Sequence, residues 1–144
     1  MSYWDSSALA KLYLTEPDSA VFQSLAERPD PMRTSPLGQF ETILTIRRHE
    51  ADGRLDRRTA DTLADELLVD LASGVVEVVA AEFDLHAEFQ HVVETCFRRS
   101  APISIRTLDA LHLAAALSAN ETELVSNDVR QRTAAQALGM TVLP

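Results

Sequence analysis

Four carboxylates stand out because each is placed at the end, or on the inner face, of a predicted element. Asp5 comes directly after a short apolar run at the start of the chain and directly before a helical pattern. Asp128 repeats that order, and Asp109 falls in the first turn of another predicted helix. Glu41 shares the apolar face of a further helix. Open α/β sheets bind ligands at the carboxyl ends of their strands, so these acids form one pocket if the fold brings them to that edge.

Two of these acids also have an ordinary structural interpretation. Asp5, or its neighbour Ser6, is a good helix N-cap, because both side chains accept hydrogen bonds from the first free backbone amides. Glu41 needs a partner on an apolar face, and that partner is either an arginine or a metal ion. A functional role therefore depends on whether the carboxylates meet.

A pocket of four carboxylates has a definite chemistry. Like charges at short range repel and raise one another's pKa, so a cation is expected among them. Oxygen ligands alone suit Mg²⁺ or Mn²⁺, and the Cys/His spacing typical of zinc is absent from the sequence. A carboxylate-bound Mg²⁺ lowers the pKa of a bound water and stabilises a phosphoryl transition state. The acids thus predict phosphodiester hydrolysis or phosphoryl transfer.

Strands and helices that would position these acids alternate along the chain. Strands are expected near residues 2–4, 32–34, 75–79, 124–126 and 141–143. Helices are expected over residues 6–14, 19–27, 36–51, 58–72, 82–99, 106–117 and 129–138, with Gly139 as a C-cap. This alternation predicts an α/β sandwich with a parallel-rich sheet, and the length predicts one domain over residues 1–144.

Apolar spacing predicts the buried side of three of these helices. In the helix that carries Glu41, the side expected to be buried consists of Leu37, Phe40, Ile43 and Leu44. The same reasoning places Leu63, Leu67, Leu68 and Leu71 inside the next helix, and Leu85, Phe89, Val92, Val93, Cys96 and Phe97 inside the one after it.

The composition describes a globular, intracellular protein. Hydrophobic residues make up 46% of the 144 residues, and no apolar run approaches the roughly 20 residues of a membrane span. The start lacks the basic and apolar regions of a signal peptide. Cys96 is the only cysteine and lies on an apolar stripe, which favours a packed core thiol over a nucleophile. We therefore expect a cytoplasmic protein that does not associate with membranes.

The net charge of −9 argues against broad, non-specific binding of nucleic acid. The charge does not exclude a local basic path for nucleic acid, because nearly all the positive charge is arginine, which binds phosphate bidentately. The arginines cluster at 47–58, at 98–106 and at 130–132, and each cluster is either such a path or an ordinary solvated helix face.

His112 lies one turn after Asp109 on the same side of the least polar predicted helix. A helix that is apolar nearly all round belongs in the middle of a fold. A lone histidine in such a helix is either a hydrogen-bonded structural residue or a ligand, and the sequence favours the structural role.

Two other acidic-pocket families are excluded by the residues around Asp5. A response-regulator receiver would require neighbouring acids after its first strand and a late lysine, whereas Lys11 is the only lysine here. A haloacid-dehalogenase phosphatase would require a second aspartate two residues after the first, and that position is Ser7.

The motifs together resemble the PIN-domain ribonucleases of the VapC toxin type. The start Tyr3-Trp4-Asp5-Ser6-Ser7-Ala8-Leu9 is similar to that family's opening, and Arg106-Thr107-Leu108-Asp109-Ala110-Leu111-His112 to its third-acid motif. Leu124-Val125-Ser126-Asn127-Asp128 is similar to its final-acid motif, and the helix from Ser35 to Glu41 fits the element that carries its second acid. The resemblance covers the whole chain in the right order.

This resemblance implies a PIN-like three-layer α/β/α sandwich with a mostly parallel central sheet of about five strands. It implies a Mg²⁺-dependent endoribonuclease (Mn²⁺ being the alternative ion) that is the toxin of a type II toxin–antitoxin system. Carried over by position, the catalytic and metal-binding acids are Asp5, Glu41, Asp109 and Asp128. Ser6, Ser126 and Asn127 would support the site by hydrogen bonding.

The resemblance also implies partners: an RNA substrate, a cognate antitoxin protein and a second copy of the chain, with a toxin–antitoxin hetero-oligomer as a further assembly. For the RNA backbone the candidate contacts are Arg48, two turns beyond Glu41 on the same side of its helix, and Arg106. The alternative from a different functional class is a catalytically silent PIN fold that binds RNA or protein without turnover. The presence of all four acids argues against that alternative.

Overall fold

The computed structural model describes residues 1–79 and 85–144. In chain order its elements are β1 (Ser2–Trp4), α1 (Ser6–Tyr13), α2 (Ser19–Ala26), β2 (Met32–Thr34), α3 (Pro36–Ala51), α4 (Arg57–Ser73), β3 (Val76–Val78), α5 (Leu85–Phe97), α6 (Thr107–Ser118), β4 (Glu123–Val125), α7 (Val129–Ala137) and β5 (Thr141–Leu143). The predicted helix over residues 82–99 corresponds to α5, and its expected first residues lie outside the described part of the chain.

The five strands form one parallel sheet in the order β3-β2-β1-β4-β5. β1 is central and pairs with β2 on one side and with β4 on the other, so that Trp4 lies opposite Val125. The α/β class and the parallel sheet of about five strands predicted from the sequence are therefore confirmed.

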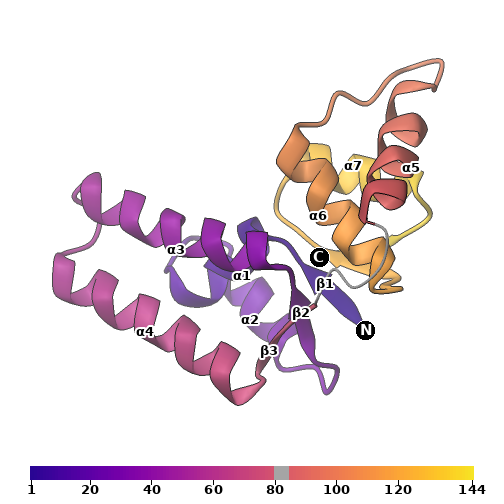
Figure 1. Ribbon diagram of the computed structural model, residues 1–144. Coiled ribbons are helices and arrows are strands. Elements are labelled where there is room, and N and C mark those ends of the chain that lie inside the picture. Colours follow the sequence, from indigo (N-terminus) through magenta and orange to yellow (C-terminus); the bar gives the residue numbers. More distant parts are fainter. Residues whose placement is uncertain (80–84) are drawn as a thin grey trace.

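Alternation along the strands divides the interior into two hydrophobic cores. Trp4 and Val125 pack into one core with residues of α1, α2, α3 and α4. Tyr3 and Leu124 point to the opposite face and pack with residues of α5, α6 and α7. Figure 1 shows the same division, with α1 to α4 on one side of the strands and α5 to α7 on the other. The sheet is thus the middle layer of three.

Polar residues follow three neighbouring strands at the carboxyl edge of the sheet. Asp5 follows β1, Ser35 follows β2 and Ser126 follows β4. Asp5 and Ser35 are also the N-caps of α1 and α3, and Asp128 caps α7. The chain turns from strand to helix at each of these points, so the caps of three helices lie along one edge of the sheet.

The predicted inner face of α3 is wrong at two positions. Phe40 and Leu44 are 60% and 48% exposed, whereas the buried residues of α3 are Gly38, Thr42 and Ile46. The helix therefore packs through a different face, where Gly38 lets the α3 backbone come close to β2. Leu68 on α4 and Phe97 on α5 were also expected inside and are 47% and 46% exposed.

Gly38 is a position where α3 touches the rest of the fold without room for a side chain. A Cβ there would lie 2.0 Å from Thr34 Oγ1 and 3.6 Å from His112 Cε1. Thr34 is fully buried and its hydroxyl donates to the Trp4 carbonyl oxygen (2.8 Å), so it cannot turn aside without breaking that bond.

Gly38→Ala is therefore expected to destabilise the protein, although alanine is the better helix former. Overpacking of this kind costs about 1–3 kcal/mol, which outweighs the roughly 1 kcal/mol gained in helix propensity. Urea unfolding measures the change, with the neighbouring Gln39→Ala as the control. A Gly38→Ala protein as stable as the parent would show that α3 does not pack this tightly on β2.

The apolar stripe on α5 also predicts a packed Cys96. Cys96 is fully buried, as predicted, and burial raises the pKa of its thiol. In residues 1–79 and 85–144, no helix has the length and apolar character that crossing a membrane requires.

Candidate active site

Asp5 is the most enclosed of the candidate acids, with only 1% of the residue exposed. Its Oδ1 accepts hydrogen bonds from the Ala8 backbone amide (2.9 Å) and from Ser7 Oγ (2.7 Å), and its Oδ2 accepts one from Ser126 Oγ (2.5 Å). Burial raises the pKa of the Asp5 carboxyl above its ordinary value, and these hydrogen bonds offset part of that effect. The protein thus holds this carboxyl rigidly in a place that favours added positive charge.

Two serines tie Asp5 to the turn between β4 and α7. Ser126 Oγ, which donates to Asp5, accepts a hydrogen bond from the Asp128 backbone amide (3.0 Å). Ser7 Oγ accepts one from the Asn127 backbone amide (2.8 Å). Asn127 therefore contacts the site through its backbone amide. Ser7, which is not among the residues predicted from the sequence, links Asp5 to that amide.

Glu41 comes from α3 and is held from two sides. Its Oε2 accepts hydrogen bonds from Ser6 Oγ (2.8 Å), on α1, and from His112 Nε2 (2.6 Å), on α6. The hydrogen bond from His112 lowers the pKa of Glu41, which opposes the effect of burial, and the charge of Arg48 adds a smaller effect in the same direction. Glu41 therefore remains a carboxylate, and its partners within the protein are a histidine and a serine, where the sequence left an arginine or a metal ion open.

A buried chain of hydrogen bonds continues behind His112. Its Nδ1 lies 2.8 Å from the phenolic oxygen of Tyr3, and that oxygen lies 2.7 Å from Ser35 Oγ. Burial raises the pKa of Tyr3, which therefore stays a neutral phenol. His112 is 2% exposed, so both of its ring nitrogens are fixed by partners inside the protein.

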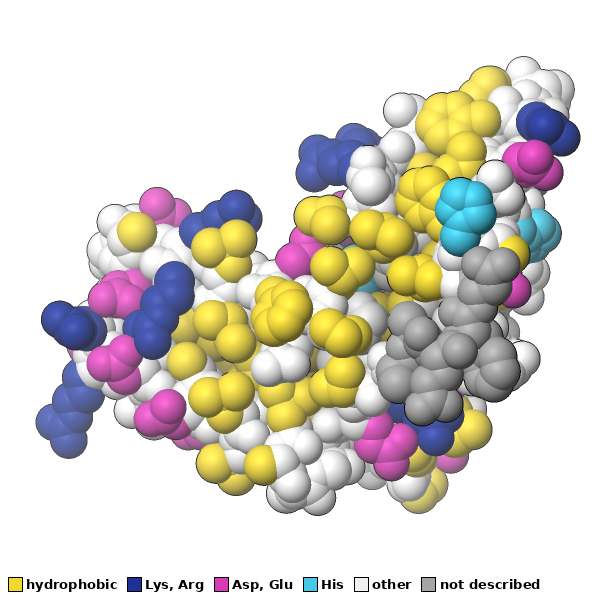
Figure 2. Space-filling view, in the orientation of Figure 1, with side chains coloured by type: hydrophobic (Ala, Val, Ile, Leu, Met, Phe, Trp, Pro, Cys, Tyr) yellow, Lys and Arg dark blue, Asp and Glu magenta, His cyan; other side chains and the backbone are white. Residues whose placement is uncertain are grey.

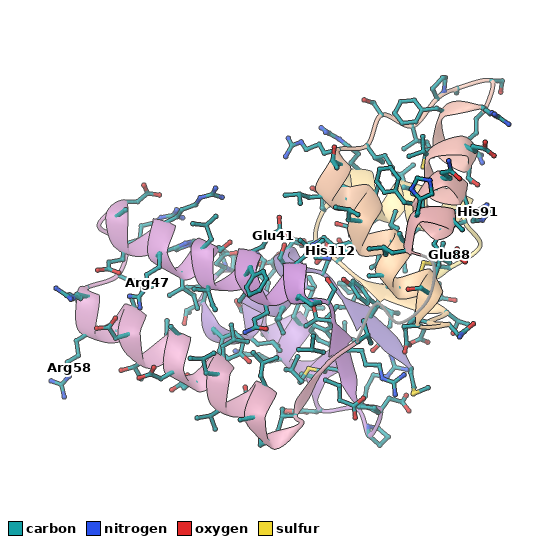
Figure 3. The ribbon with its side chains drawn as sticks, in the orientation of Figure 1. Glu41, Arg47, Arg58, Glu88, His91 and His112 are labelled. Carbon is teal, nitrogen blue, oxygen red and sulfur yellow. The ribbon has the colours of Figure 1, made fainter. Side chains whose placement is uncertain are left out.

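The side chain of Glu41 lies where the two groups of helices diverge. Figure 3 shows Glu41 on α3 beside His112. Figure 2 shows that the surface is hollowed between the α3 side and the α5–α6 side of the molecule. Both recorded hydrogen bonds of the carboxylate use Oε2, and among the described residues Oε1 has no hydrogen-bond partner. One oxygen of Glu41 is thus available for a ligand.

Asp109 and Asp128 are held mainly as helix caps. Asp109 Oδ2 accepts a hydrogen bond from the Arg106 backbone amide (3.0 Å) at the start of α6. Asp128 Oδ1 accepts from the amides of Arg130 (2.8 Å) and Gln131 (3.0 Å) at the start of α7. Both side chains are partly exposed, and the other oxygen of each has no recorded partner among the residues described.

A match to a known protein family covers nearly the whole chain. A family model of the PIN domain matches residues 2–137. The chain belongs to the PIN-domain family.

Two curated PIN-domain relatives from Mycobacterium tuberculosis match over nearly their full length. Ribonuclease VapC46 is 30% identical, and the match covers 98% of this chain and 95% of that protein. Ribonuclease VapC47 is 27% identical, with 96% and 93% covered. The crystal structure of VapC20 from the same organism, a toxin described as cleaving the sarcin-ricin loop, superimposes with a TM-score of 0.69. Its identity is 22% over the whole of both chains, so it supports the fold alone.

The four predicted acids differ in how closely the PIN fold links them to one another. Asp5 and Asp128 are joined through Ser126, and Asp5 and Glu41 are joined through the adjacent residues Ser6 and Ser7. Asp109 lies one turn before His112 on α6, and no contact to another candidate acid is recorded for it in the described residues. The expectation that crowding raises every pKa is wrong for Glu41, because His112 supplies a favourable partner.

The donor atoms of this PIN domain fit a hard divalent cation. Within residues 1–79 and 85–144, no three His, Cys, Asp or Glu side chains are close enough to hold a metal ion together. Mg²⁺ in proteins commonly binds through only one or two carboxylates and keeps several waters, so three side chains in direct contact are not required. Glu41 keeps one oxygen without a partner among the described residues, and the buried Asp5 carboxyl is connected to it through the adjacent residues Ser6 and Ser7.

The structure adds His112, Tyr3 and Ser7 to the candidate site. The sequence favours a hydrogen-bonded structural histidine, and the hydrogen bonds are confirmed, but one of the two partners is the candidate acid Glu41. The one-turn spacing between Asp109 and His112 was the signal that could have found it. Tyr3 and Ser7 carry no such signal, because their roles depend on contacts between distant segments.

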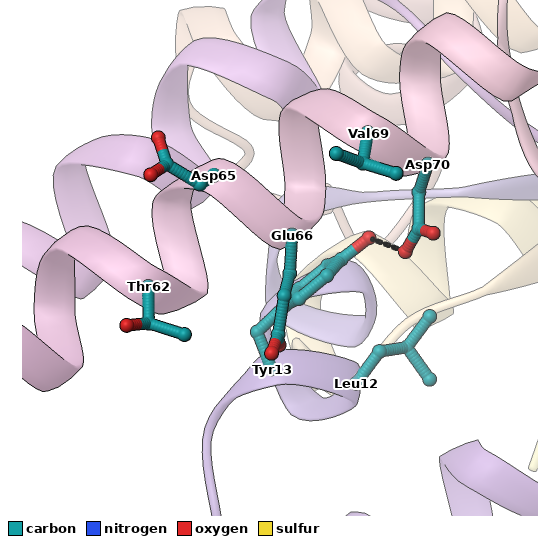
Figure 4. Close-up of a pocket in the computed structure, with 7 residues that line it drawn as sticks. All are labelled: Leu12, Tyr13, Thr62, Asp65, Glu66, Val69 and Asp70. Atoms are coloured by element: carbon teal, nitrogen blue, oxygen red, sulfur yellow. Dashed lines mark hydrogen bonds between the residues drawn. The ribbon is translucent and has the colours of Figure 1, made fainter.

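A further cavity lies elsewhere, between α1 and α4 (Figure 4). It measures about 490 Å³, and its acidic lining residues are Asp65, Glu66 and Asp70. Tyr13 donates a hydrogen bond to Asp70 Oδ2 (2.7 Å) across it. None of the candidate site acids lines this cavity, and acidic residues alone do not indicate a ligand.

Proposed function

We propose that this protein is a metal-dependent endoribonuclease and the toxin of a type II toxin–antitoxin pair, with residues 1–144 forming one PIN domain. The observation that carries the proposal is the enclosed Asp5 carboxyl, hydrogen-bonded at the carboxyl edge of the sheet and linked through Ser6 and Ser7 to Glu41. The likeness to Ribonuclease VapC46 over nearly the full length of both chains supports RNA as the substrate.

The protein's own groups hold the carboxylates that would bind the metal ion at the reacting phosphate. Asp5 is fixed by hydrogen bonds to both oxygens, and Glu41 keeps Oε1 open while Oε2 is held by Ser6 and His112. Asp109 and Asp128 would contribute their outward oxygens from the starts of α6 and α7. When bound, Mg²⁺ or Mn²⁺ would orient and acidify a water and stabilise the charge on the phosphoryl oxygens.

Arg48 and Arg106 are proposed to contact the RNA backbone beside these acids. Both residues are exposed, and among the described residues neither guanidinium is paired with a carboxylate. Arg48 lies on the helix of Glu41, and Arg106 directly precedes α6. Their charges would oppose the repulsion between RNA and a protein of net charge −9.

Protein partners are proposed from the family and from exposed apolar side chains. Phe40 and Leu44 on α3, and Leu68 and Val69 on α4, are between 47% and 63% exposed. Hydrophobic side chains gather over the α3–α4 side of the face shown in Figure 2, which is typical of an interaction surface. A second copy of the chain and the antitoxin are the proposed occupants. The cytoplasm is the proposed location, because the proposed substrate is RNA. Light scattering that finds only monomers at micromolar concentration would contradict the homodimer.

The test is incubation of the purified protein with total RNA in Mg²⁺, in Mn²⁺ or with a chelator. Cleavage is expected with either ion and none with the chelator, because the carboxylates alone cannot activate water. RNA that stays intact under all three conditions, although the protein binds it, would favour the catalytically silent binding module instead.

A further inference from the structure

The positive charges of the described residues fall into two groups, those already paired within the protein and those still free. Carboxylates pair with Lys11, Arg28, Arg33, Arg47, Arg54 and Arg98. Arg132 donates to the backbone carbonyl oxygens of Ser126, Leu143 and Pro144. Residues 1–79 and 85–144 offer no carboxylate partner to the remaining arginines, which are Arg48, Arg57, Arg58, Arg99, Arg106 and Arg130.

Two of these free arginines line the same cavity. A hollow of about 480 Å³ lies between the α5–α6 connection and α7, and Arg99 and Arg130 enter it from opposite segments of the chain. A backbone hydrogen bond from Ile103 to Cys96 (2.9 Å) folds the connection back onto α5 and so shapes one wall. The described lining contains no acidic residue: it consists of Arg99, Ser100, Ala101, Pro102, Ile103, Ser104, Arg130 and Thr133.

Hydrogen-bond donors in this cavity are in excess. No partner is recorded for the hydroxyls of Ser100 and Ser104 among the described residues, and both residues are exposed. Thr133 differs, because its hydroxyl already donates to the Val129 carbonyl oxygen (2.8 Å). The first amides of α7 are taken by Asp128, so an anion here would be bound by side chains. Two guanidinium groups and two hydroxyls are suited to the oxygens of a phosphate.

The cavity adjoins the candidate acids on the α6–α7 side. Ser104 shortly precedes Arg106, whose amide is capped by Asp109, and Arg130 shortly follows Asp128. Arg58, by contrast, projects from the far end of α4 in Figure 3, and Arg47 in the same region is paired with Asp61 (2.7 Å). On the opposite side of the acids, Arg48 is a free arginine on the helix that carries Glu41.

We propose that the cavity between Arg99 and Arg130 binds a phosphate of the RNA backbone, distinct from the phosphate that is cleaved. This inference rests on the proposed function and adds the path that the RNA takes across the protein. The RNA runs from Arg48 on α3, across the candidate acids, to Arg99 and Arg130 beside α7. An acidic protein without a broad basic surface then holds its substrate at few points, and each of them affects affinity strongly.

The test measures the binding of a fluorescein-labelled single-stranded RNA by anisotropy, with chelator present to prevent cleavage. The variants are Arg99→Ala/Arg130→Ala and, as the matched control, Arg98→Ala, which removes the neighbouring arginine that pairs with Glu94. The double variant is expected to bind about 10-fold more weakly at low salt. Its plot of log affinity against log salt should be shallower by roughly 0.7–1.4, the contribution of one or two phosphate contacts on a single strand. Arg98→Ala should match the parent.

Two further measurements test the role of charge in the cavity and the end of the RNA that reaches it. Arg99→Lys/Arg130→Lys should recover part of the lost affinity, because charge remains without bidentate geometry. Shortening the RNA from one end, and not from the other, should abolish the difference between the double variant and the parent.

If the parent cleaves RNA and the double variant binds it with the same affinity and salt dependence, the cavity is not a backbone site. If the cavity arginines instead change only the binding of inorganic phosphate, measured by calorimetry, the cavity holds a free anion and the proposal is overturned. A parent that neither binds nor cleaves RNA would refute the proposed function itself. Circular dichroism of each variant shows whether it is folded, and Arg130→Ala alone replaces the double variant if that one is not.

Discussion

Asp5→Asn is expected to reduce RNA cleavage by on the order of 10²–10³-fold while the protein stays folded. The substitution keeps the shape of the side chain and an oxygen that can accept from Ala8 and Ser7, so the start of α1 remains capped. It removes the enclosed negative charge that would hold a divalent cation. Initial rates on a labelled RNA in Mg²⁺ measure the loss. Asp52→Asn is the control, because Asp52 is exposed and pairs only with Arg54 among the described residues.

Asp5→Asn is also expected to change how the free energy of unfolding depends on pH. Burial raises the folded pKa of Asp5, so between the ordinary aspartate pKa of about 3.9 and the raised value the folded state binds more protons than the unfolded state. Without metal, this residue therefore costs stability as the pH rises through that interval, and the cost persists at neutral pH. Asp5→Asn is expected to gain stability relative to the parent as the pH increases from about 4 to 7.

Urea unfolding of both proteins with chelator, at several pH values, gives this difference directly, because all other titrating groups are common to the two. A variant that becomes less stable relative to the parent as the pH rises would show that the Asp5 carboxylate is stabilised inside the protein. In that case Asp5 would be a structural cap, and its assignment to the active site would lose its physical basis.

His112→Asn is expected to weaken Mn²⁺ binding and RNA cleavage by about 10–100-fold, the range for residues that orient a metal ligand. The shorter amide reaches the position of Nδ1 near Tyr3 and leaves Glu41 without its donor. His112→Gln is the matched variant, because its amide reaches the position of Nε2 and keeps a donor to Glu41. His112→Gln should therefore retain most of the Mn²⁺ affinity that His112→Asn loses.

Calorimetric titration with Mn²⁺ measures this difference without relying on turnover, and thermal melting checks the fold of each variant. If His112 serves only to fill the core, both variants should lose stability and neither should change the affinity for Mn²⁺. Equal Mn²⁺ affinities for the two variants would remove His112 from the site and leave it as a packing residue.

The elements of this fold were predictable because strand and helix signals are local. The apolar run before Asp5, the Ser35-Pro36 start of α3 and the glycine after α7 each act within a few residues, and the structure places an element boundary at all three. Parallel pairing followed from the alternation of strands and helices. Parallel pairing also predicts that Asp5 and the turn after β4 lie at one edge of the sheet, because both follow neighbouring strands.

The inner face of α3 could not be obtained that way. Apolar spacing favoured Phe40 and Leu44, but α3 packs by the face that carries Gly38. Gly38 lies at short range from Thr34 and His112, so that face has to turn inward. Such a close approach depends on β2 and α6, which are distant in the sequence. The hydrogen bond from His112 to Glu41 likewise spans separate elements, so neither residue indicates its partner in isolation.

The most direct test of the central claim is mass spectrometry of the RNA ends left by the parent and by Asp5→Asn, in Mg²⁺ and with chelator. A water activated at the carboxylate site displaces one side of the phosphodiester and leaves a terminal monophosphate opposite a hydroxyl. Attack by the RNA's own 2′-hydroxyl would instead leave a 2′,3′-cyclic phosphate. We expect Mg²⁺-dependent monophosphate ends that disappear in Asp5→Asn. Cyclic phosphate ends, or cleavage that survives both the chelator and Asp5→Asn, would contradict it.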